Sequence, residues 1–204
     1  MNASSGFRNL HWSGLAATCS LWLALGILAR PGAGQTKEDD RLWESVRSGE
    51  AFVLMRHALA PGTGDPGNFE IADCATQRNL SEAGRRQARE IGERFRASGI
   101  DEASVFTSQW CRCRETAELL DLGPVSELPA LNSFFQEYER RDDQTEALNE
   151  WLLTRDASDR RALVLVTHQV NITATAGVYP SSGEIVVCSL SHEGALEVLG
   201  RIDG

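Results

Sequence analysis

Two histidines and two arginines in this 204-residue chain have the right types and positions to bind and attack a phosphate group. Arg56 and His57 are neighbours, and Arg112 and His168 lie much farther along the chain. A neutral imidazole is an accepted covalent nucleophile, and the planar guanidinium group of arginine binds phosphate oxygens in pairs. Phosphoryl transfer needs both groups, because its transition state spreads charge over the non-bridging oxygens. We therefore take His57 as the candidate nucleophile and the other three residues as candidate phosphate ligands.

Each of these residues also has an ordinary explanation when it is considered alone. A histidine at the end of a strand is more often structural than catalytic, and a single arginine is usually an ion-pair partner or a solvated surface residue. The chain contains only four histidines. His11 lies in the N-terminal segment and His192 in an expected hairpin turn. The equivalent positions of His57 and His168, each directly after an apolar run, favour one shared site.

Three short apolar runs are typical of buried parallel strands: residues 51–56 (AFVLMR), 103–107 (ASVFT) and 162–167 (ALVLVT). Helical patterns separate them, so the sequence predicts an α/β fold, namely a single-domain three-layer α/β/α sandwich with a mostly parallel sheet. Ligands of such sheets bind beyond the carboxyl ends of the strands. His57, Ser108 and His168 each follow one of these strands, which places them at one edge.

The remaining elements frame that edge. Ser81 is an expected helix N-cap, and the stretch from residue 58 to 79 is rich in proline and glycine and predicts a long loop. A brief strand and a C-terminal hairpin complete the sheet. The other expected helices cover residues 37–47, 112–122, 144–154 and 170–176, the brief strand covers 125–128, and the hairpin covers 183–190 and 195–202.

The N-terminal residues predict export. Arg8 and His11 precede an apolar run over residues 15–28, and small residues follow at 32–34. This is the pattern of a secretory signal peptide, and the run is short for a membrane-spanning helix, which needs about 20 residues. We expect residues 1–34 to be a signal peptide and residues 35–204 to be the mature domain, exported to the periplasm or secreted, without stable membrane insertion after cleavage. A retained anchor is the alternative.

The charge balance restricts the partners. The chain carries 20 basic and 29 acidic residues, a net charge of −9. Residues 1–34 contain two of the basic residues and no acidic one, so the mature part has 18 against 29, or −11. Such a body repels nucleic acid, which excludes a nucleic-acid partner. A phosphate ligand must therefore bind in a local basic pocket.

Four cysteines remain after the expected cleavage: Cys74, Cys111, Cys113 and Cys188. In an oxidising compartment an even number suggests disulfide bonds. Cys188 lies in an apolar strand pattern and is expected to be a buried free thiol. One of Cys111 and Cys113 is expected to pair with Cys74. Zinc binding is the weaker alternative, because no histidine has a suitable spacing.

Four motifs carry a resemblance to a known family. Residues 54–58 (LMRHA), 79–88 (NLSEAGRRQA), 108–117 (SQWCRCRETA) and 164–168 (VLVTH) resemble, in order, the motifs of the histidine phosphatase superfamily, which includes the phosphoglycerate mutases. The resemblance implies the phosphoglycerate mutase-like fold and a phosphoric monoester hydrolase that needs no metal and no cofactor. It further implies that His57 becomes phosphorylated and that Arg56, Arg112 and His168 complete the phosphate pocket.

The proton donor is open at this point. The mutase-like branch places a glutamate after the second arginine motif, where this chain has Glu137 and Glu139 in the run FFQEYE. Flanking aromatic residues could raise the pKa of a carboxyl group there by desolvation, which makes Glu137 the first candidate. A solvated surface charge is the alternative for both. Asp65 and Glu70 are further candidates, whereas Gln169 stands where the acid-phosphatase branch has its aspartate.

The substrate is suggested only by analogy. Arg78 is a candidate substrate ligand, and Arg140 and Arg141 are weaker ones. The chain resembles exported members related to lipopolysaccharide core heptose phosphatases, which implies a phosphorylated envelope sugar as substrate. The alternatives are a phosphohistidine protein phosphatase, for which a donor-free site would suit the good leaving group, and a non-catalytic phosphate- or glycan-binding protein of the same fold.

Overall fold

The computed structural model describes Met1, residues 33–156 and residues 159–204 of the chain. The expected signal peptide falls almost entirely outside these residues, and so do its proposed features. Contacts divide the chain into two units, Met1–Pro31 and Gly32–Gly204, and the second contains every helix and strand described below. Within the described ranges, no helix has the length and apolar character needed to cross a membrane.

A six-stranded sheet in the order β3-β2-β4-β1-β5-β6 forms the centre of the second unit. The first four strands in that order are parallel to one another, β5 runs antiparallel to β1, and β6 runs antiparallel to β5. The bounds are β1 Phe52–Arg56, β2 Ala103–Thr107, β3 Val125–Glu127, β4 Ala162–Thr167, β5 Ile185–Leu190 and β6 Leu196–Ile202. The predicted mostly parallel sheet is confirmed.

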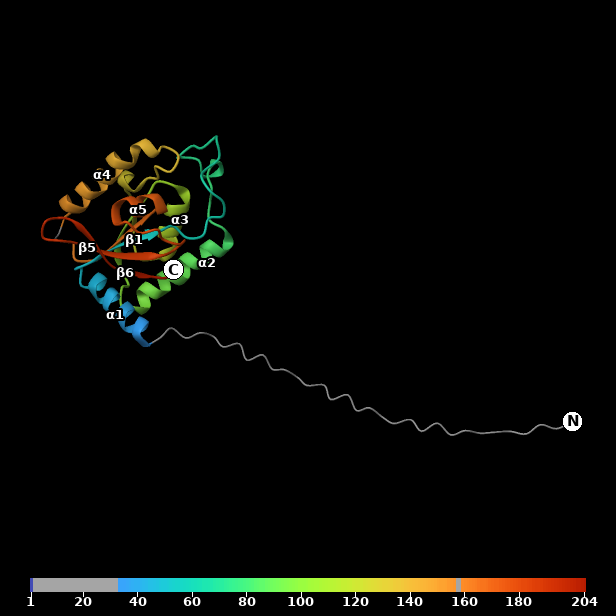
Figure 1. Cartoon of the computed structure of the whole chain (residues 1–204), viewed down its shortest axis with the longest axis horizontal. Coiled ribbons are helices and arrows are strands. Elements are labelled where there is room, and N and C mark those ends of the chain that lie inside the picture. The colour runs from blue at the N-terminus through green and yellow to red at the C-terminus, as the bar shows by residue number, and fades with distance from the viewer. Residues whose placement is uncertain (2–32, 157–158) are drawn as a thin grey trace. The chain divides into compact units, whose positions relative to one another are not determined.

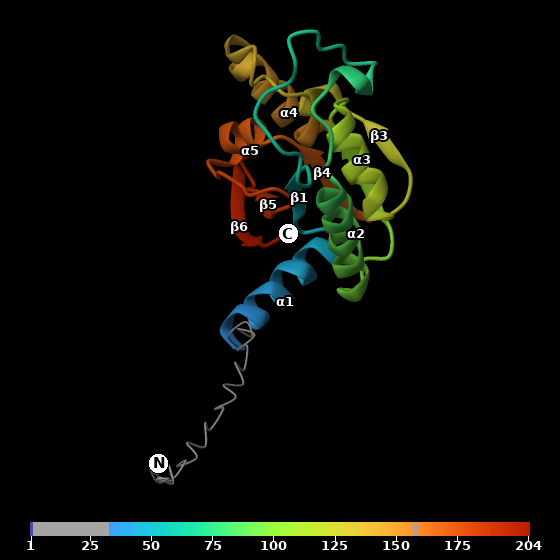
Figure 2. The ribbon, with the colours of Figure 1, turned by 90° about the vertical axis from the view of Figure 1, so that its right-hand side faces the viewer.

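Helices cover both faces of this sheet (Figures 1 and 2). One core joins Val53, Met55 and Val164 to residues of α1, α2 and α3, and the other joins Leu54 and Leu165 to residues of α4 and α5. The period of two along β1 explains the division, because successive side chains of a strand point to opposite faces. The predicted three-layer sandwich is therefore confirmed. The helices are α1 Ala33–Arg47, α2 Glu82–Ala97, α3 Cys111–Leu120, α4 Arg141–Thr154 and α5 Gln169–Ala176.

Local signals fix several of these boundaries. The Ser81 hydroxyl accepts a hydrogen bond from the Gly84 N–H, as its predicted N-cap role requires. Helix α3 ends two residues earlier than predicted, because Asp121 adopts a left-handed conformation with φ 53°. Helix α4 begins three residues earlier than predicted, because the 3₁₀ turn Tyr138–Arg140 leads directly into it. The expected loop contains one more such turn, Cys74–Thr76.

Strand register brings the candidate residues to one edge. Arg56 at the end of β1 pairs with Thr167 of β4, and Thr107 of β2 pairs with Val166. The backbone N–H of His57 donates to the Thr167 carbonyl oxygen at 3.0 Å. The residues that follow these three strands therefore leave the sheet side by side.

Candidate active site

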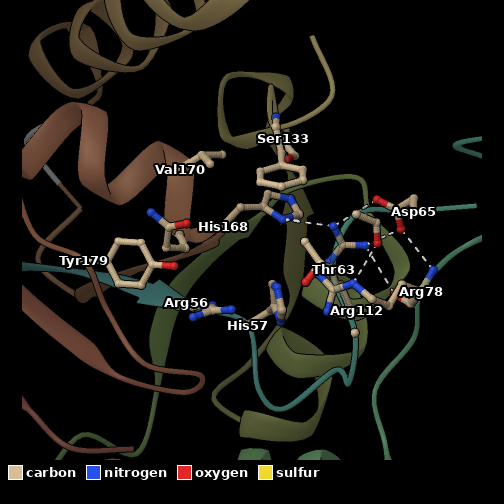
Figure 3. A pocket seen from close by; sticks show the side chains of 14 residues that line it. Arg56, His57, Thr63, Asp65, Arg78, Arg112, Ser133, His168, Val170 and Tyr179 are labelled. Atoms are coloured by element: carbon tan, nitrogen blue, oxygen red, sulfur yellow. Dashed lines mark hydrogen bonds and ion pairs between the residues drawn. The ribbon is translucent and has the colours of Figure 1, made fainter. Parts of the chain in front are cut away.

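A cavity of about 130 Å³ opens at this carboxyl edge. Its charged and imidazole-bearing lining residues come from two strand ends, from the start of α3, and from the loop between β1 and α2. Figure 3 shows the two imidazole rings and the guanidinium group of Arg112 facing one another. These lining residues are Arg56, His57, Asp65, Arg78, Arg112 and His168.

His57 is held as a neutral ring with one free nitrogen. Its side chain is almost completely buried, and its Nδ1 lies 2.8 Å from the Ala58 carbonyl oxygen. A carbonyl oxygen only accepts, so Nδ1 carries the proton and Nε2 keeps its lone pair. Burial, together with the positive charge of Arg112, lowers the pKa of His57 to about 3. At neutral pH the ring therefore has a nucleophilic Nε2.

His168 faces His57, with 5.6 Å between the ring centroids. Its Nε2 lies 2.8 Å from the Ser108 hydroxyl oxygen, and its Nδ1 lies 3.5 Å from Nη2 of Arg112. Because a guanidinium group only donates, Nδ1 is the acceptor and Nε2 donates its proton to Ser108. Burial, followed by the charge of Arg112, lowers the pKa of His168 well below its usual value. Ser108 in turn lies 3.3 Å from Oδ1 of Asn132, to which its hydroxyl donates.

Three guanidinium groups supply the positive charge. Arg112 is buried at the N-terminal end of α3, while Arg56 and Arg78 are half-buried. Arg56 donates from Nη1 to the Pro180 carbonyl oxygen at 2.9 Å, and Arg78 donates from Nε to that of Gly64 at 2.9 Å. Burial lowers the pKa of both Arg56 and Arg78. The pocket is therefore locally basic within an acidic protein.

Asp65 forms a buried ion pair with Arg112. The side chains of both residues are only 3% exposed, and the shortest distance between them joins Nη1 to Oδ1 at 2.7 Å. Burial alone would raise the pKa of Asp65, but the hydrogen bonds and charge of Arg112 and the further donors around it give a net lowering. Asp65 is thus an ionised member of the pocket.

The structure does not bring Glu137 into this pocket. The side chain of Glu137 is 57% exposed and accepts from Nη1 of Arg140 at 2.7 Å. It lines a separate cavity of about 370 Å³, together with Phe69 and Trp110. The desolvation predicted from its aromatic neighbours is absent, because Phe134 turns into the protein interior and leaves Glu137 at the surface. Glu70, Glu139 and Arg141 are also exposed and do not line the pocket.

Two aromatic residues line the mouth of the pocket: Phe135, which lies in the run FFQEYE that the sequence analysis considered, and Tyr179, which the sequence did not single out. Phe135 is 48% exposed and Tyr179 is 70% exposed. Figure 3 places Tyr179 on the Arg56 side of the pocket. Both residues stand in irregular segments, where neither periodicity nor a strand end marks a position. Asn132 was also missed, although its side chain holds Ser108 and the backbone N–H of Gln109.

The cysteines behave as predicted. Cys74 and Cys111 form a disulfide with a Cα–Cα distance of 5.7 Å, which joins the loop before α2 to the first residue of α3. Cys113 and Cys188 are buried free thiols. Burial raises the pKa of each of these two thiols to about 12. Groups of three or more histidine, cysteine, aspartate or glutamate residues that could hold a metal ion do not occur among the described residues.

One protein-family model matches more than half of the chain. The model of the family described as "Histidine phosphatase superfamily (branch 1)" matches residues 52–163. No curated protein sequence gives a significant match.

Solved structures share the fold at low sequence identity. The protein histidine phosphatase SixA, complexed with tungstate, is 14% identical with a TM-score of 0.55, and the match covers 75% of this chain and 96% of that chain. A mycobacterial glucosyl-3-phosphoglycerate phosphatase in complex with VO₃ is 15% identical with a TM-score of 0.55, covering 76% and 100%. A phosphoserine phosphatase of Entamoeba histolytica, in complex with 3-phosphoglyceric acid, is 12% identical with a TM-score of 0.53, covering 76% and 97%.

Proposed function

The chain belongs to the histidine phosphatase superfamily, and from this membership we propose that it is a metal-independent phosphatase that hydrolyses a phosphomonoester through a phosphohistidine on His57. The observation that carries the proposal is the hydrogen bond from Nδ1 of His57 to the Ala58 carbonyl oxygen. It leaves Nε2 unprotonated inside a pocket lined by three guanidinium groups. That combination supplies a nucleophile and a binding site for the transferred phosphoryl group.

The proposed reaction has two steps. Nε2 of His57 attacks phosphorus, the bond from phosphorus to the leaving oxygen breaks, and the leaving group departs with the electron pair of that bond and takes a proton from solvent water. Water then attacks the phosphohistidine, the P–N bond breaks, and inorganic phosphate is released. Arg56, Arg78, Arg112 and His168 bind the non-bridging oxygens, on which negative charge collects. His168 takes a proton on Nδ1 when the anion binds and then donates to it.

The mouth of the pocket favours a substrate with a ring. Phe135 and Tyr179 expose aromatic faces there, and Thr63, Ser133 and Gln169 add polar groups. Aromatic faces stack on the apolar face of a ring, while polar side chains bind its hydroxyl groups. A phosphosugar of the cell envelope fits this combination. The Cys74–Cys111 disulfide supports the proposed export, because disulfides persist in oxidising compartments.

One observation favours a second substrate class. Asp65 is the single carboxylate among the described residues that line the pocket, and it is ion-paired with Arg112. Proton donation by Glu137 would require the segment that carries it to move towards His57. A leaving group that departs without help from a carboxylic acid, such as the imidazole of a protein phosphohistidine, suits this arrangement. The phosphohistidine protein phosphatase therefore stays as the second candidate.

Turnover of p-nitrophenyl phosphate by residues 35–204, with a chelator present, tests the proposal. We expect activity in the wild type and its loss, by about 1,000-fold or more, in His57→Ala. His192→Ala is the matched control, because His192 is an exposed histidine of the β5–β6 turn and should leave the rate unchanged. Rapid quenching followed by peptide mass spectrometry should place a phosphoryl group on the peptide that contains His57.

Three outcomes separate the candidates. Equal rates in wild type and His57→Ala would refute catalysis by His57. Phosphate binding without turnover by the wild type would identify a non-catalytic binding protein. Higher kcat/KM for a phosphohistidine peptide than for phosphosugars would select the second substrate class.

A further inference from the structure

Every hydrogen-bonding position of the Asp65 carboxylate is occupied. Oδ1 accepts from Nη1 of Arg112 at 2.7 Å and from the backbone N–H of Arg78 at 3.0 Å. Oδ2 accepts from Nη2 of Arg112 at 3.1 Å and from Nε1 of Trp110 at 3.0 Å. An ionised carboxylate has about four lone-pair positions, and the four donors together fill them and leave none for a proton. Asp65 is therefore built as a fixed anion rather than as a proton donor.

The ion pair with Asp65 leaves one edge of the Arg112 guanidinium group for a ligand. Besides its two bonds to Asp65, Nη1 lies 3.3 Å from the Arg78 carbonyl oxygen and Nη2 lies 3.5 Å from Nδ1 of His168. The contact with His168 is the longest of the four. A phosphate oxygen between Arg112 and His168 could replace it while the bidentate pair with Asp65 stays intact. Asp65 thus fixes which N–H of Arg112 points at the phosphate.

Asp65 also sets the charge of the pocket. The described lining contains three guanidinium groups and one carboxylate, and lowered pKa values keep both imidazoles neutral. Three positive charges and one negative charge give a net charge of +2. A phosphomonoester dianion carries a charge of −2, which is equal and opposite to the charge of the pocket before the ligand binds. Without Asp65 the pocket would carry +3 and would hold the phosphate product more tightly.

Residues 110–112, at the start of α3, contact the loop between β1 and α2 that carries Asp65. The Trp110 ring stacks on Phe69 at a centroid distance of 5.0 Å, in addition to its bond to Asp65. Cys111 forms the disulfide with Cys74, and its backbone N–H donates to Oε1 of Gln77 at 2.9 Å. Arg112 follows directly. The start of α3 therefore holds Asp65 itself and the part of the loop that follows it.

We infer that Asp65 is a positioning residue, a permanent internal anion that orients the guanidinium group of Arg112 towards the bound phosphate and matches the pocket charge to a phosphate dianion. The inference rests on the proposed function in that the pocket must bind phosphate. It assigns Asp65 a role different from the proton donation for which the sequence made it a candidate.

Asp65→Asn tests the inference with two readouts. Asparagine has nearly the same size, but it lacks the charge, and its amide NH₂ cannot accept from Arg112. We expect kcat for p-nitrophenyl phosphate to fall by about 10-fold or more, since Arg112 loses its orientation. We also expect the Kd for inorganic phosphate, measured by isothermal titration calorimetry at neutral pH, to fall by about 3-fold to 10-fold, since the pocket gains a positive charge. Damaged folding would lower both kcat and the affinity for phosphate. A lower kcat together with a higher phosphate affinity therefore identifies the positioning role.

Two further variants make the test specific. Glu70→Gln removes one negative charge from the same loop, but Glu70 is exposed and lies outside the pocket, so both readouts should stay at wild-type values. Trp110→Phe removes one donor to Asp65 and keeps a ring for Phe69, so kcat should fall less than in Asp65→Asn while the Kd for phosphate stays unchanged.

Contrary results would overturn the inference. These are an unchanged or weaker phosphate affinity in Asp65→Asn, or a tighter affinity in Glu70→Gln. Calorimetry is independent of turnover. A wild type that binds phosphate without hydrolysing p-nitrophenyl phosphate would thus refute the proposed function alone, and the Kd of Asp65→Asn would still decide the role of Asp65.

Discussion

The surroundings of His57 keep its ring neutral at pH values where an ordinary imidazole would be protonated. The ring is buried beside Arg112, and its Nδ1 donates to the Ala58 carbonyl oxygen. Burial and the positive charge of Arg112 both oppose a second proton on the ring, whereas the hydrogen bond to Ala58 does not. The same features that leave Nε2 free for attack therefore also make the folded state sensitive to acid.

This sensitivity gives a prediction about stability. An unfolded chain protonates His57 near pH 6.5, whereas the folded pocket resists protonation until about pH 3. The contribution of neutral His57 to the free energy of unfolding is therefore fully present above pH 6.5 and is lost as the pH falls towards 3. His57→Asn cannot take up this proton. Between pH 6.5 and 5 the free energy of unfolding of His57→Asn should therefore fall less steeply than that of the wild type. The difference between the two slopes should be about 1.4 kcal/mol per pH unit.

Urea denaturation at a series of pH values measures this difference. His192→Asn changes an exposed histidine and should follow the wild-type curve. Parallel curves for the wild type and His57→Asn would show that His57 takes up its proton over the same pH range in the folded protein as in the unfolded chain, which would refute the lowered pKa.

At the scale of elements, the sheet explains how much of the site the sequence could predict. Arg56, His57 and His168 directly follow apolar runs, and parallel strands align their carboxyl ends, so their convergence follows from the strand pattern. Asp65 and Tyr179 lie in irregular segments. Their positions depend on tertiary contacts such as the disulfide and the Phe69–Trp110 stack, which leave no periodic signal in the sequence. The convergence of the strand ends was therefore predictable, whereas in the irregular segments the sequence named Asp65 and Arg78 as candidates without their contacts and missed Tyr179.

The disulfide is the element-level contact whose removal is simplest to interpret. Cys74 and Cys111 are separated by 37 residues, and closing such a loop stabilises a protein by about 2–4 kcal/mol. Reductant should lower the free energy of unfolding of the wild type by this amount. It should also lower kcat/KM, because Asp65 and Arg78 reach the pocket on the loop that the disulfide fixes to α3.

The double variant Cys74→Ser/Cys111→Ser supplies the control. It should behave like the reduced wild type in guanidinium denaturation and in turnover, and reductant should not change it. Cys113 and Cys188 are buried thiols and remain present in this variant. If reductant affected the double variant as strongly as the wild type, the loss would come from something other than this disulfide.

At the scale of the whole molecule, an acidic protein contains a basic pocket. The chain carries a net charge of −9, whereas the pocket lining carries +2. Charged polymers such as nucleic acid meet the repulsion of the whole surface, whereas a small phosphomonoester interacts mainly with the pocket. Selectivity for small phosphorylated groups thus follows from the charge distribution before any specific contact is considered.

The same scale carries the prediction about export. Every described helix and strand belongs to the unit Gly32–Gly204, so residues 35–204 contain both hydrophobic cores, the disulfide and the whole pocket. We expect the precursor expressed in a Gram-negative host to yield a periplasmic protein whose N-terminus, determined by mass spectrometry, lies near Gln35. We also expect residues 35–204, produced with a disulfide, to match that protein in thermal midpoint and in kcat/KM. Recovery of the uncleaved chain in the membrane fraction would instead identify residues 1–34 as a retained anchor, and the catalytic proposal would stand without change.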